Sequence, residues 1–238
     1  MTTIGILGAG QAGATLARSA IEAGYSVLIT NSRSPQTIAD LARSLGPRAR
    51  ATWAADAAAA ADFAVLAFPY VPGHALPTEE LAGKVVLDNN NYMPWRDGTF
   101  SAVDAGTRTV HELRQEQLPA AKLAKALSHI QFHGRDQVRV PGDEAPALVR
   151  LARPAGAPDR SALVVSSNYP EAVELVRGFY DRLGFDTVDN SPLNESWRST
   201  PGTPMWQASF DGQSREELIR NLQRAERTRP SSSRSPAG

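Results

Sequence analysis

Short apolar runs and helical patterns alternate along the first half of the chain. Apolar runs that are typical of fully buried strands occur at residues 4–7, 26–30, 63–68 and 84–88. After the first run, apolar residues recur every three or four positions, at Leu16, Ala17, Ala20 and Ile21. This alternation predicts an α/β fold built on a parallel sheet.

The remaining elements follow from the same periodicities and from signals at their ends. Further strands are expected at residues 50–52, 122–127, 162–166 and 185–188. Helices are expected at residues 34–46, 54–61, 77–81, 110–118 and 170–183. A last helix is expected to begin at Ser214, because Ser214 and Glu217 have the spacing of a capping box.

The first predicted strand leads into a glycine-rich turn. Gly8, Gly10 and Gly13 have the Gly-x-Gly-x-x-Gly spacing and stand directly between a strand and a helix. In dinucleotide-binding turns, these glycines allow the tight turn, the close approach of the pyrophosphate and the packing of helix on strand. Phosphates bind at such a helix N-terminus because its N–H groups are free and its dipole favours negative charge. We therefore expect cofactor contacts from Gly8, Ala9, Gly10, Gln11, Ala12 and Gly13.

The organisation of the chain follows from this turn and from the later loss of pattern. A Rossmann-type doubly wound parallel sheet is expected over residues 1–128. From His129 to Pro158, proline, glycine and charge replace the periodic pattern, as at a domain boundary or an active-site lid. Strands and helices then resume, which predicts a small α+β C-terminal domain over residues 129–226. Residues 227–238 are rich in serine, proline and arginine and are expected to be disordered.

The end of the second strand indicates which nucleotide is bound. Asn31, Ser32 and Arg33 stand where NAD enzymes carry an acidic residue for the ribose 2'-hydroxyl. A guanidinium beside small polar side chains suits a 2'-phosphate instead, which a carboxylate would repel. These three residues therefore favour NADP(H) over NAD, although Arg33 could also be a solvated residue at the start of the next helix.

Other cofactor contacts are expected where later strands end. Ligands bind outside the carboxyl ends of the strands in open α/β sheets. The run Asn89–Asn91 is also consistent with an ordinary turn, since asparagine is a common turn former. We expect the ribose and nicotinamide to contact Phe68, Pro69, Tyr70, Asn89, Asn90 and Ala126.

Composition excludes several classes of function. The 25 basic and 25 acidic residues give a net charge of zero, so no bulk field attracts nucleic acid or an anionic membrane. Without cysteine, disulfides and thiolate chemistry are impossible, and a cytoplasmic location is expected. The N-terminus does not have the features of a signal peptide, and the apolar segment at 57–68 is too short to span a bilayer. We expect neither a nucleic-acid nor a membrane partner, and no metal site.

These motifs together resemble the NADPH-dependent oxidoreductases that use the deazaflavin coenzyme F420. The resemblance extends to about Pro204 and implies a Rossmann domain with a small C-terminal domain, a homodimer, and direct hydride transfer between NADP(H) and a flavin-like acceptor such as F420. It rests on Ile4–Gly13, Asn31–Arg33, Phe68-Pro69, Asp88–Tyr92, Lys125-Ala126, Gly184–Asp186, Trp197-Arg198 and Pro201–Pro204.

Several positions depart from the family pattern. Leu127 and Ser128 replace a common phenylalanine and asparagine, Thr37 stands where a lysine can occur, and Ala9 replaces a polar residue. The stretch 131–140 beside the expected acceptor is also unusual. These departures affect deazaflavin binding more than NADP binding.

Two other functions remain open. Reduction of an imine or carbonyl would need a proton donor, and the candidates are His129, His133, Tyr92 and Asp88. His129 is the favoured catalytic residue because it follows the sixth strand. Alternatively, the chain is a non-catalytic NADP sensor whose partner surface includes Trp197, Met205 and Trp206. The chain contains no HExxH, GxSxG or P-loop sequence, and no tyrosine is followed by a lysine four residues later.

Overall fold

One mostly parallel sheet organises the chain. The computed structural model describes residues 1–134 and 144–227. Within those residues the strands form a single eight-stranded sheet in the order β3-β2-β1-β4-β5-β6-β7-β8. The strands are β1 (Thr3–Leu7), β2 (Ser26–Thr30), β3 (Ala49–Ala51), β4 (Phe63–Leu66), β5 (Val85–Asp88), β6 (Lys122–Lys125), β7 (Ala162–Ser167) and β8 (Asp186–Asp189).

The strand order confirms the predicted Rossmann-type doubly wound fold. The six strands β1 to β6 are mutually parallel in the order 3-2-1-4-5-6 of dinucleotide-binding sheets. β7 is antiparallel to β6, and β8 is parallel to β7. The C-terminal strands therefore extend the same sheet. The division into domains at residue 128 stays a prediction, and residues 228–238 of the predicted disordered tail lie outside the described residues.

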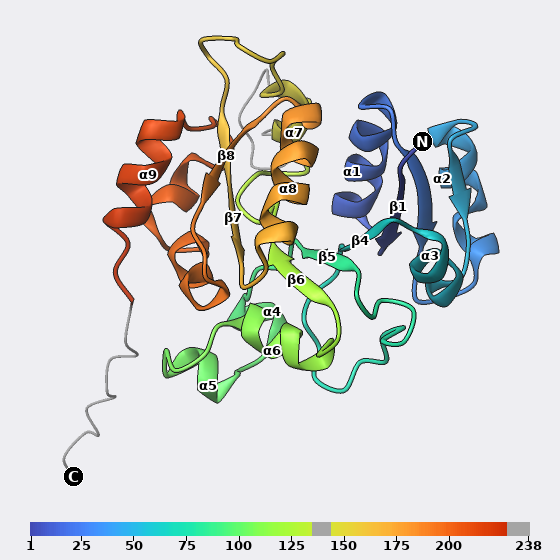
Figure 1. The fold of residues 1–238 in the computed structure, drawn as a ribbon, viewed down its shortest axis with the longest axis horizontal. Coiled ribbons are helices and arrows are strands. Elements are labelled where there is room, and N and C mark those ends of the chain that lie inside the picture. The colour runs from blue at the N-terminus through green and yellow to red at the C-terminus, as the bar shows by residue number, and fades with distance from the viewer. Residues whose placement is uncertain (135–143, 228–238) are drawn as a thin grey trace.

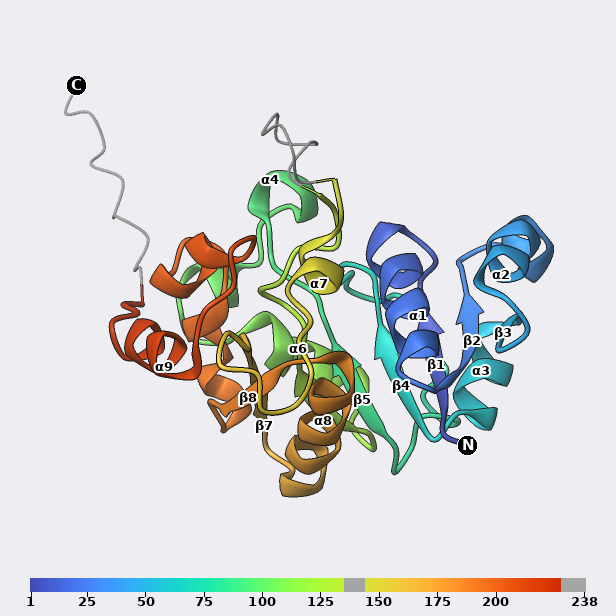
Figure 2. The same cartoon turned by 90° about the horizontal axis from the view of Figure 1, so that it is seen from above.

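Helices cover both faces of the sheet (Figure 1 and Figure 2). α1, α2 and α3 surround the N-terminal strands at one end, and α9 lies at the other. The helices are α1 (Gln11–Glu22), α2 (Ala39–Leu45), α3 (Ala54–Ala60), α4 (Pro94–Asp97), α5 (Ser101–Asp104), α6 (Val110–Gln117), α7 (Ala147–Arg150), α8 (Pro170–Leu183) and α9 (Arg215–Gln223). Short 3-10 helices are η1 (Pro35–Ile38), η3 (Leu193–Ser199) and η4 (Pro204–Ala208).

Three hydrophobic clusters form the core. The largest packs α1, α2 and α8 on one face of the sheet, with Leu16 and Phe179 fully buried in it. On the other face, Ala58 of α3, Leu118 after α6 and Leu193 of η3 cover the central strands. α9 and η4 cover β7 and β8 in a third cluster. Because both faces of the central strands are covered, these strands consist of continuous apolar runs.

Some predicted elements have different lengths in the structure. The helix expected at 34–46 is the 3-10 helix η1 followed by α2, and the expected helix at 77–81 is wrong, because this segment forms consecutive turns. The sixth strand ends at Lys125, two residues early, because Leu127 adopts a left-handed conformation. The predicted capping box of α9 is confirmed. No helix in the described ranges has the length and apolar character needed to cross a bilayer.

Candidate functional site

The surroundings of each of the three glycines after β1 explain in a different way why a side chain is absent there. Gly8 has φ +118°, and a Cβ there would lie 2.6 Å from the carbonyl oxygen of Ala67. A Cβ on Gly13 would lie 1.9 Å from the carbonyl oxygen of Gly8, so α1 packs directly on the turn. A Cβ on Gly10 would meet no atom within 4 Å, so the turn faces open space at that point. The turn therefore has the form that a dinucleotide pyrophosphate requires.

The start of α1 is suited to an anion. Gly10 is its N-cap residue and supplies no side-chain cap, and the first turn contains no acidic residue. The N–H groups of this turn are consequently left without side-chain partners, and the helix dipole adds partial positive charge. The residues present fit the pyrophosphate of NADP(H).

A groove of about 810 Å³ runs along the carboxyl ends of β1, β2 and β4. Its lining contains one arginine, one histidine and no carboxylate, so an anionic ligand meets no like charge there. Gln11, Ala12 and Gly13 do not line it. The predicted cofactor residues that do line it are Gly8, Ala9, Gly10, Asn31, Ser32, Arg33, Phe68 and Pro69.

The loop after β2 is held in place by Asn31. The Asn31 amide donates to the hydroxyl of Thr37 at 2.6 Å, and its Oδ1 accepts from the backbone N–H of Arg33 at 3.1 Å. Arg33 itself is exposed, and its guanidinium makes no ion pair within the described residues. Its charge is therefore available to a phosphate in the groove.

A second pocket, of about 210 Å³, continues from the groove. Ala67, Phe68 and Pro69 line both cavities, so these residues form the junction. The second pocket lies at the ends of β5 and β6, and Ala12, Asn89 and Asn90 from the predicted set line it. A dinucleotide in the groove would reach this pocket with its nicotinamide end.

Four predicted cofactor residues line neither cavity: Gln11 and Gly13 in the first turn of α1, and Tyr70 and Ala126 after later strands. Tyr70 is buried, and its ring lies edge-on to Phe100 at 5.3 Å between centroids. Ala126 is fully buried in the core. Tyr70 and Ala126 each follow the end of a strand, but their side chains point into the interior and pack beneath the site.

A buried ion pair packs against Phe68 at the junction of the two cavities. Arg114 of α6 and Asp88 of β5 are both fully buried and lie 3.3 Å apart. The Arg114 guanidinium also lies over the rings of Phe68 at 5.1 Å and Tyr70 at 5.2 Å. Burial raises the pKa of Asp88, and Arg114 opposes that shift. Asp88 is therefore a structural carboxylate rather than a free proton donor.

A second buried cation joins the sheet to the C-terminal segment. Lys125 of β6 is fully buried, and its Nζ donates to the carbonyls of Ser196 at 2.8 Å and Ser199 at 3.0 Å in η3. Burial lowers the pKa of Lys125 to about 7, while Asp88 acts in the opposite direction. Lys125 positions η3 and does not line either cavity.

The structure does not support the predicted catalytic role of His129. Its side chain is turned into the interior, where Nε2 accepts a hydrogen bond from the backbone N–H of Val164 at 2.8 Å. Burial lowers the pKa of His129 to about 3, so the imidazole is neutral at physiological pH. It lines neither the groove nor the second pocket. A neutral side chain that faces away from the ligand cannot serve as a general acid.

The other candidate proton donors also have structural partners. The Tyr92 hydroxyl donates to Asp104 at 2.7 Å and accepts from the backbone N–H of Phe100 at 3.2 Å. His133 packs edge-on against Phe210, with ring centroids 5.2 Å apart. Residues 135–140 of the unusual stretch 131–140 lie outside the described residues.

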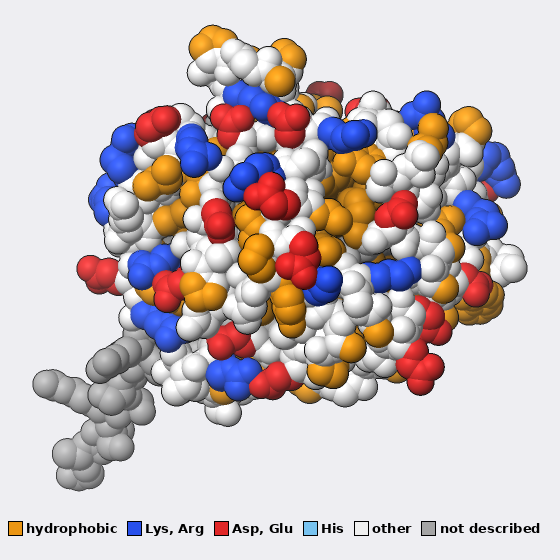
Figure 3. Space-filling view, viewed as in Figure 1, with side chains coloured by type: hydrophobic (Ala, Val, Ile, Leu, Met, Phe, Trp, Pro, Cys, Tyr) orange, Lys and Arg blue, Asp and Glu red, His pale blue; other side chains and the backbone are white. Residues whose placement is uncertain are grey.

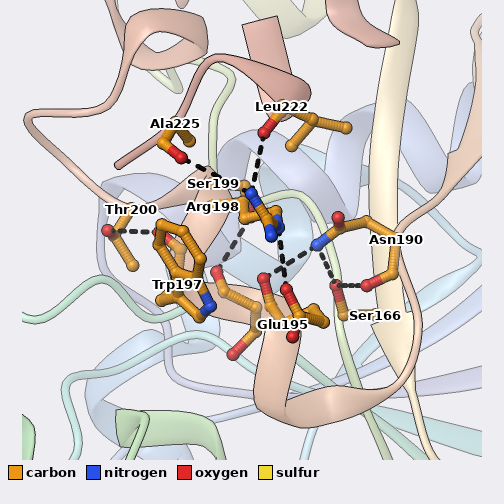
Figure 4. A network of polar contacts seen from close by, with 10 residues as sticks. Ser166, Asn190, Glu195, Trp197, Arg198, Ser199, Thr200, Leu222 and Ala225 are labelled. Atoms are coloured by element: carbon orange, nitrogen blue, oxygen red, sulfur yellow. Dashed lines mark hydrogen bonds and ion pairs between the residues drawn. The ribbon is translucent and has the colours of Figure 1, made fainter. Parts of the chain in front are cut away.

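The three residues of the expected partner surface, Trp197, Met205 and Trp206, are partly or fully buried. Met205 is fully buried, and Trp206 packs against the same cluster. Figure 4 shows Arg198 extending from η3 to the end of α9, where it donates to the carbonyls of Leu222 and Ala225. Arg198 also lies 4.4 Å from the centroid of the Trp197 ring. These contacts stabilise the fold, and the expected partner surface stays a prediction, with Met205 buried and both tryptophans partly exposed.

Charges of both signs are interspersed on the face shown in Figure 3. The described ranges contain no group of three His, Cys, Asp or Glu residues that could hold a metal ion.

Comparison with known proteins identifies the first part of the chain. A family model described as "NADP oxidoreductase coenzyme F420-dependent" matches residues 3–92. Residues 3–92 are therefore similar to this family. The matched region contains the glycine turn, Arg33 and the junction at Phe68, which are among the residues on which the resemblance rests.

Individual proteins show similarity of different extents. YjhV from Escherichia coli K12 is 37% identical over 62 residues, which is 26% of this chain and 45% of that protein. The aligned region therefore spans less than half of that relative. A hypothetical protein, SMa0349, from Sinorhizobium meliloti is 28% identical, with a TM-score of 0.64 over 86% of this chain and 93% of that chain. A structure from Arthrobacter sp. FB24, named for an F420-dependent NADP reductase, shares the fold at 24% identity and a TM-score of 0.63, over 83% of this chain and 88% of that one.

Sequence reasoning missed lining residues both within and beyond residues 3–92. Trp53, more than half exposed, and His74 line the groove, although nothing in their local sequence indicates a ligand. Asn91 had a weak signal, as part of the asparagine run, and lines the second pocket. Ser128 and Trp206 complete that pocket from beyond residue 92. Folding of the chain brings Ser128 and Trp206 beside residues 3–92.

Proposed function

We propose that this protein is an NADP(H)-dependent oxidoreductase that transfers hydride between NADPH and a flavin-like acceptor such as coenzyme F420. The observation that carries the proposal is the pair of contiguous cavities at the carboxyl ends of the strands. The groove combines an open glycine turn with Arg33 and has no carboxylate among its described lining residues, and it continues past Phe68 into a pocket lined by Arg96 and uncharged side chains.

The chain's own residues bind and orient the reactants. The N–H groups at the start of α1 hold the pyrophosphate, and Ser32 and Arg33 hold the 2'-phosphate. Trp53 offers an exposed indole face for the adenine. Phe68, held under the guanidinium of Arg114, fixes the wall at the junction. When bound, NADPH supplies the hydride, and the contribution of the protein is proximity, orientation and exclusion of water.

A planar ring acceptor is favoured over an imine or carbonyl substrate. Reduction of a carbonyl needs a proton donor within hydrogen-bond distance. The described residues that line the second pocket include Arg96 but no carboxyl, imidazole, phenol or lysine side chain that could donate a proton. Ring-to-ring hydride transfer depends mainly on stacking, for which Phe68, Phe132 and Trp206 provide apolar surface.

A screen of acceptors tests the proposal. NADPH oxidation is followed by absorbance with F420, FMN, riboflavin and a panel of imines and carbonyls. Turnover with a flavin-like ring supports the proposal, whereas turnover with only imines or carbonyls replaces it with a small-molecule reductase. Tight binding of NADPH with no turnover on any acceptor would indicate a sensor.

The assembly and location of the protein are also proposals. We propose a homodimer, from the family resemblance, and a cytoplasmic location, from the absence of cysteine. Light scattering coupled to size exclusion tests the first, and fractionation of the source cells tests the second.

A further inference from the structure

The crossover from β4 to β5 contains no helix. Residues 67–84 form only turns, bends and irregular segments between two parallel strands. Parallel strands are usually joined through a helix, and a loop longer than about 12–15 residues is usually either functional or disordered. The burial of Leu81 and the packing of Leu76 against the core hold this loop in place. The loop contributes Val71, His74, Ala75, Leu76 and Pro77 to the lining of the groove.

The local sequence fixes the position of His74 within this loop. Residues 71–74 form a β-turn, in which the N–H of His74 donates to the carbonyl of Val71 at 3.2 Å. Pro72 at the second position and Gly73, with φ +70°, at the third are the residues that a type II turn requires. The carbonyl of Val71 also accepts from Nε2 of Gln117 at 2.8 Å. The turn that presents His74 is therefore attached to α6.

The imidazole of His74 lies beside the junction of the two cavities. Its ring centroid is 5.3 Å from that of Phe68, and Phe68 lines both cavities. Gly8 approaches the carbonyl of Ala67, the residue before Phe68, so closely that a Cβ would lie 2.6 Å from its oxygen. Because β1 lies between β2 and β4 in the sheet, the glycine turn separates the loop of Arg33 from the loop of His74. An anion on the glycine turn thus has one basic side chain on each side.

Few other charges surround His74. Arg33 is the only other charged or titratable side chain among the described residues that line the groove. Arg114 lies over the ring of Phe68 at 5.1 Å, but its charge is balanced by Asp88. The carboxylates of the neighbouring segments are Asp56, Glu79 and Glu80, and none of them lines the groove. The charge of a bound ligand is therefore the main influence on the protonation of this imidazole.

We propose that His74 takes up a proton when a dinucleotide binds and then donates a hydrogen bond from its imidazolium to the pyrophosphate. The inference rests on the proposed function, since it requires a dinucleotide in the groove. An imidazole ordinarily gains a proton at about pH 6.5, and a phosphate beside it favours the charged form. The hydrogen bond from a charged donor to a phosphate oxygen is stronger than a neutral one. Nucleotide binding is then coupled to pH, and the contribution of His74 to the affinity falls as the pH rises above neutrality.

Calorimetry measures this proton directly and needs no hydride acceptor. The full-length protein is titrated with NADPH at about pH 7.5 in buffers that differ in ionisation enthalpy, and the slope gives the number of protons taken up. The wild type should take up about half a proton more than His74→Gln. Because both proteins bind the same nucleotide, any titration of its 2'-phosphate cancels in this difference.

Three ligands identify the phosphate that His74 contacts. NADPH and 2'-phospho-ADP-ribose both contain the pyrophosphate, whereas adenosine 2'-monophosphate has only the 2'-phosphate. At about pH 6.5, His74→Gln should weaken binding of the first two about three- to tenfold, as expected for one hydrogen bond at an exposed site. The affinity for adenosine 2'-monophosphate should not change. An equal loss for adenosine 2'-monophosphate, or a loss for NADPH alone, overturns the assignment to the pyrophosphate.

Two further variants separate charge from structure. His74→Lys keeps a cation at every pH in this range, so it should bind NADPH more tightly than His74→Gln but take up no more protons than that variant. His133→Gln, at a histidine that lines neither cavity, should retain the wild-type uptake and affinities.

Equal proton uptake by the wild type and His74→Gln overturns the proposal, and so does uptake that persists at the wild-type level in His74→Lys. A wild type that binds neither NADPH nor 2'-phospho-ADP-ribose overturns the proposed function itself. Tight nucleotide binding without the difference in proton uptake overturns only the role of His74.

Discussion

At the scale of single residues, side-chain direction decides which strand-end residues can touch a ligand. Phe68 and Tyr70 are two residues apart, yet Phe68 lines both cavities and Tyr70 packs beneath them against Phe100. Asn89, Asn90 and Asn91 all line the second pocket, although one of the two interpretations of this run was an ordinary turn. A position at the end of a strand is therefore not sufficient evidence for a contact.

Arg33 gives a direct test at this scale. Arg33→Ala should reduce the preference for NADPH over NADH by about 1.5–3 kcal/mol, toward the lower end because the side chain is exposed. The reason is the loss of charge-assisted hydrogen bonds to the 2'-phosphate. Titration of both nucleotides against wild type and variant measures the change.

The control for this test is Arg43→Ala, which removes an exposed guanidinium paired with Asp40 outside the groove. It should leave the preference unchanged. Equal affinity of the wild-type protein for NADPH and NADH would contradict the assignment of Arg33.

At the scale of elements, the most important link is the one between α6 and β5. Arg114 contacts the end of β5 through Asp88 and also covers the loop after β4 through Phe68 and Tyr70. One side chain thus sets the relative position of two strand ends that form the junction. A change in this link should alter both stability and the shape of the site.

Arg114→Met should lower the free energy of unfolding by about 3–5 kcal/mol, because it leaves Asp88 buried without its cation. Urea unfolding followed by circular dichroism measures the loss. The double variant Arg114→Met/Asp88→Asn should recover much of it, since the uncompensated charge is gone. A double variant no more stable than the single one would show that packing over Phe68, and not charge, dominates.

Some features of the fold and of the site could be predicted from the sequence, and others could not. The glycine turn, the β2 end and the strand alternation were predictable, because local spacing and periodicity determine them. The Asp88–Arg114 pair was not, because the two residues are 26 positions apart and no local spacing connects them. His129 was correctly placed after β6, but the direction of its imidazole depends on Val164, 35 residues later. The conformation of Leu127 likewise depends on the hydroxyl of Tyr180, 53 residues later, which accepts a hydrogen bond from the N–H of Leu127.

At the scale of the whole molecule, the buried bases determine how stability responds to acid. Burial lowers the pKa of His129 from 6.5 to about 3, and that of His111 well below 6.5. Both side chains are neutral in the folded state, so the unfolded chain binds more protons below pH 6.5. The contribution of these two histidines to the free energy of unfolding is therefore expected to be fully present above pH 6.5 and to be lost as the pH decreases toward 3.

His129 alone should reduce stability by about 2 kcal/mol between pH 7 and pH 5, from the shift of its titration. His129→Gln should flatten this part of the profile, because the amide cannot be protonated. His74→Gln, at an exposed histidine, should keep the wild-type slope. Urea unfolding at a series of pH values makes the comparison, and an unchanged slope in His129→Gln would contradict the burial of a neutral imidazole.

The reversal of direction at β7 has a consequence for how this fold can be modified. Because β7 is antiparallel to β6 and β8 is parallel to β7, the loops that follow β7 and β8 lie at the sheet edge opposite the dinucleotide groove. A tag, a fluorescent reporter or a fused domain inserted near Asn190 would thus be far from the cofactor. The same separation gives evolution two edges to vary independently, one constrained by the nucleotide and the other free to acquire new surface features.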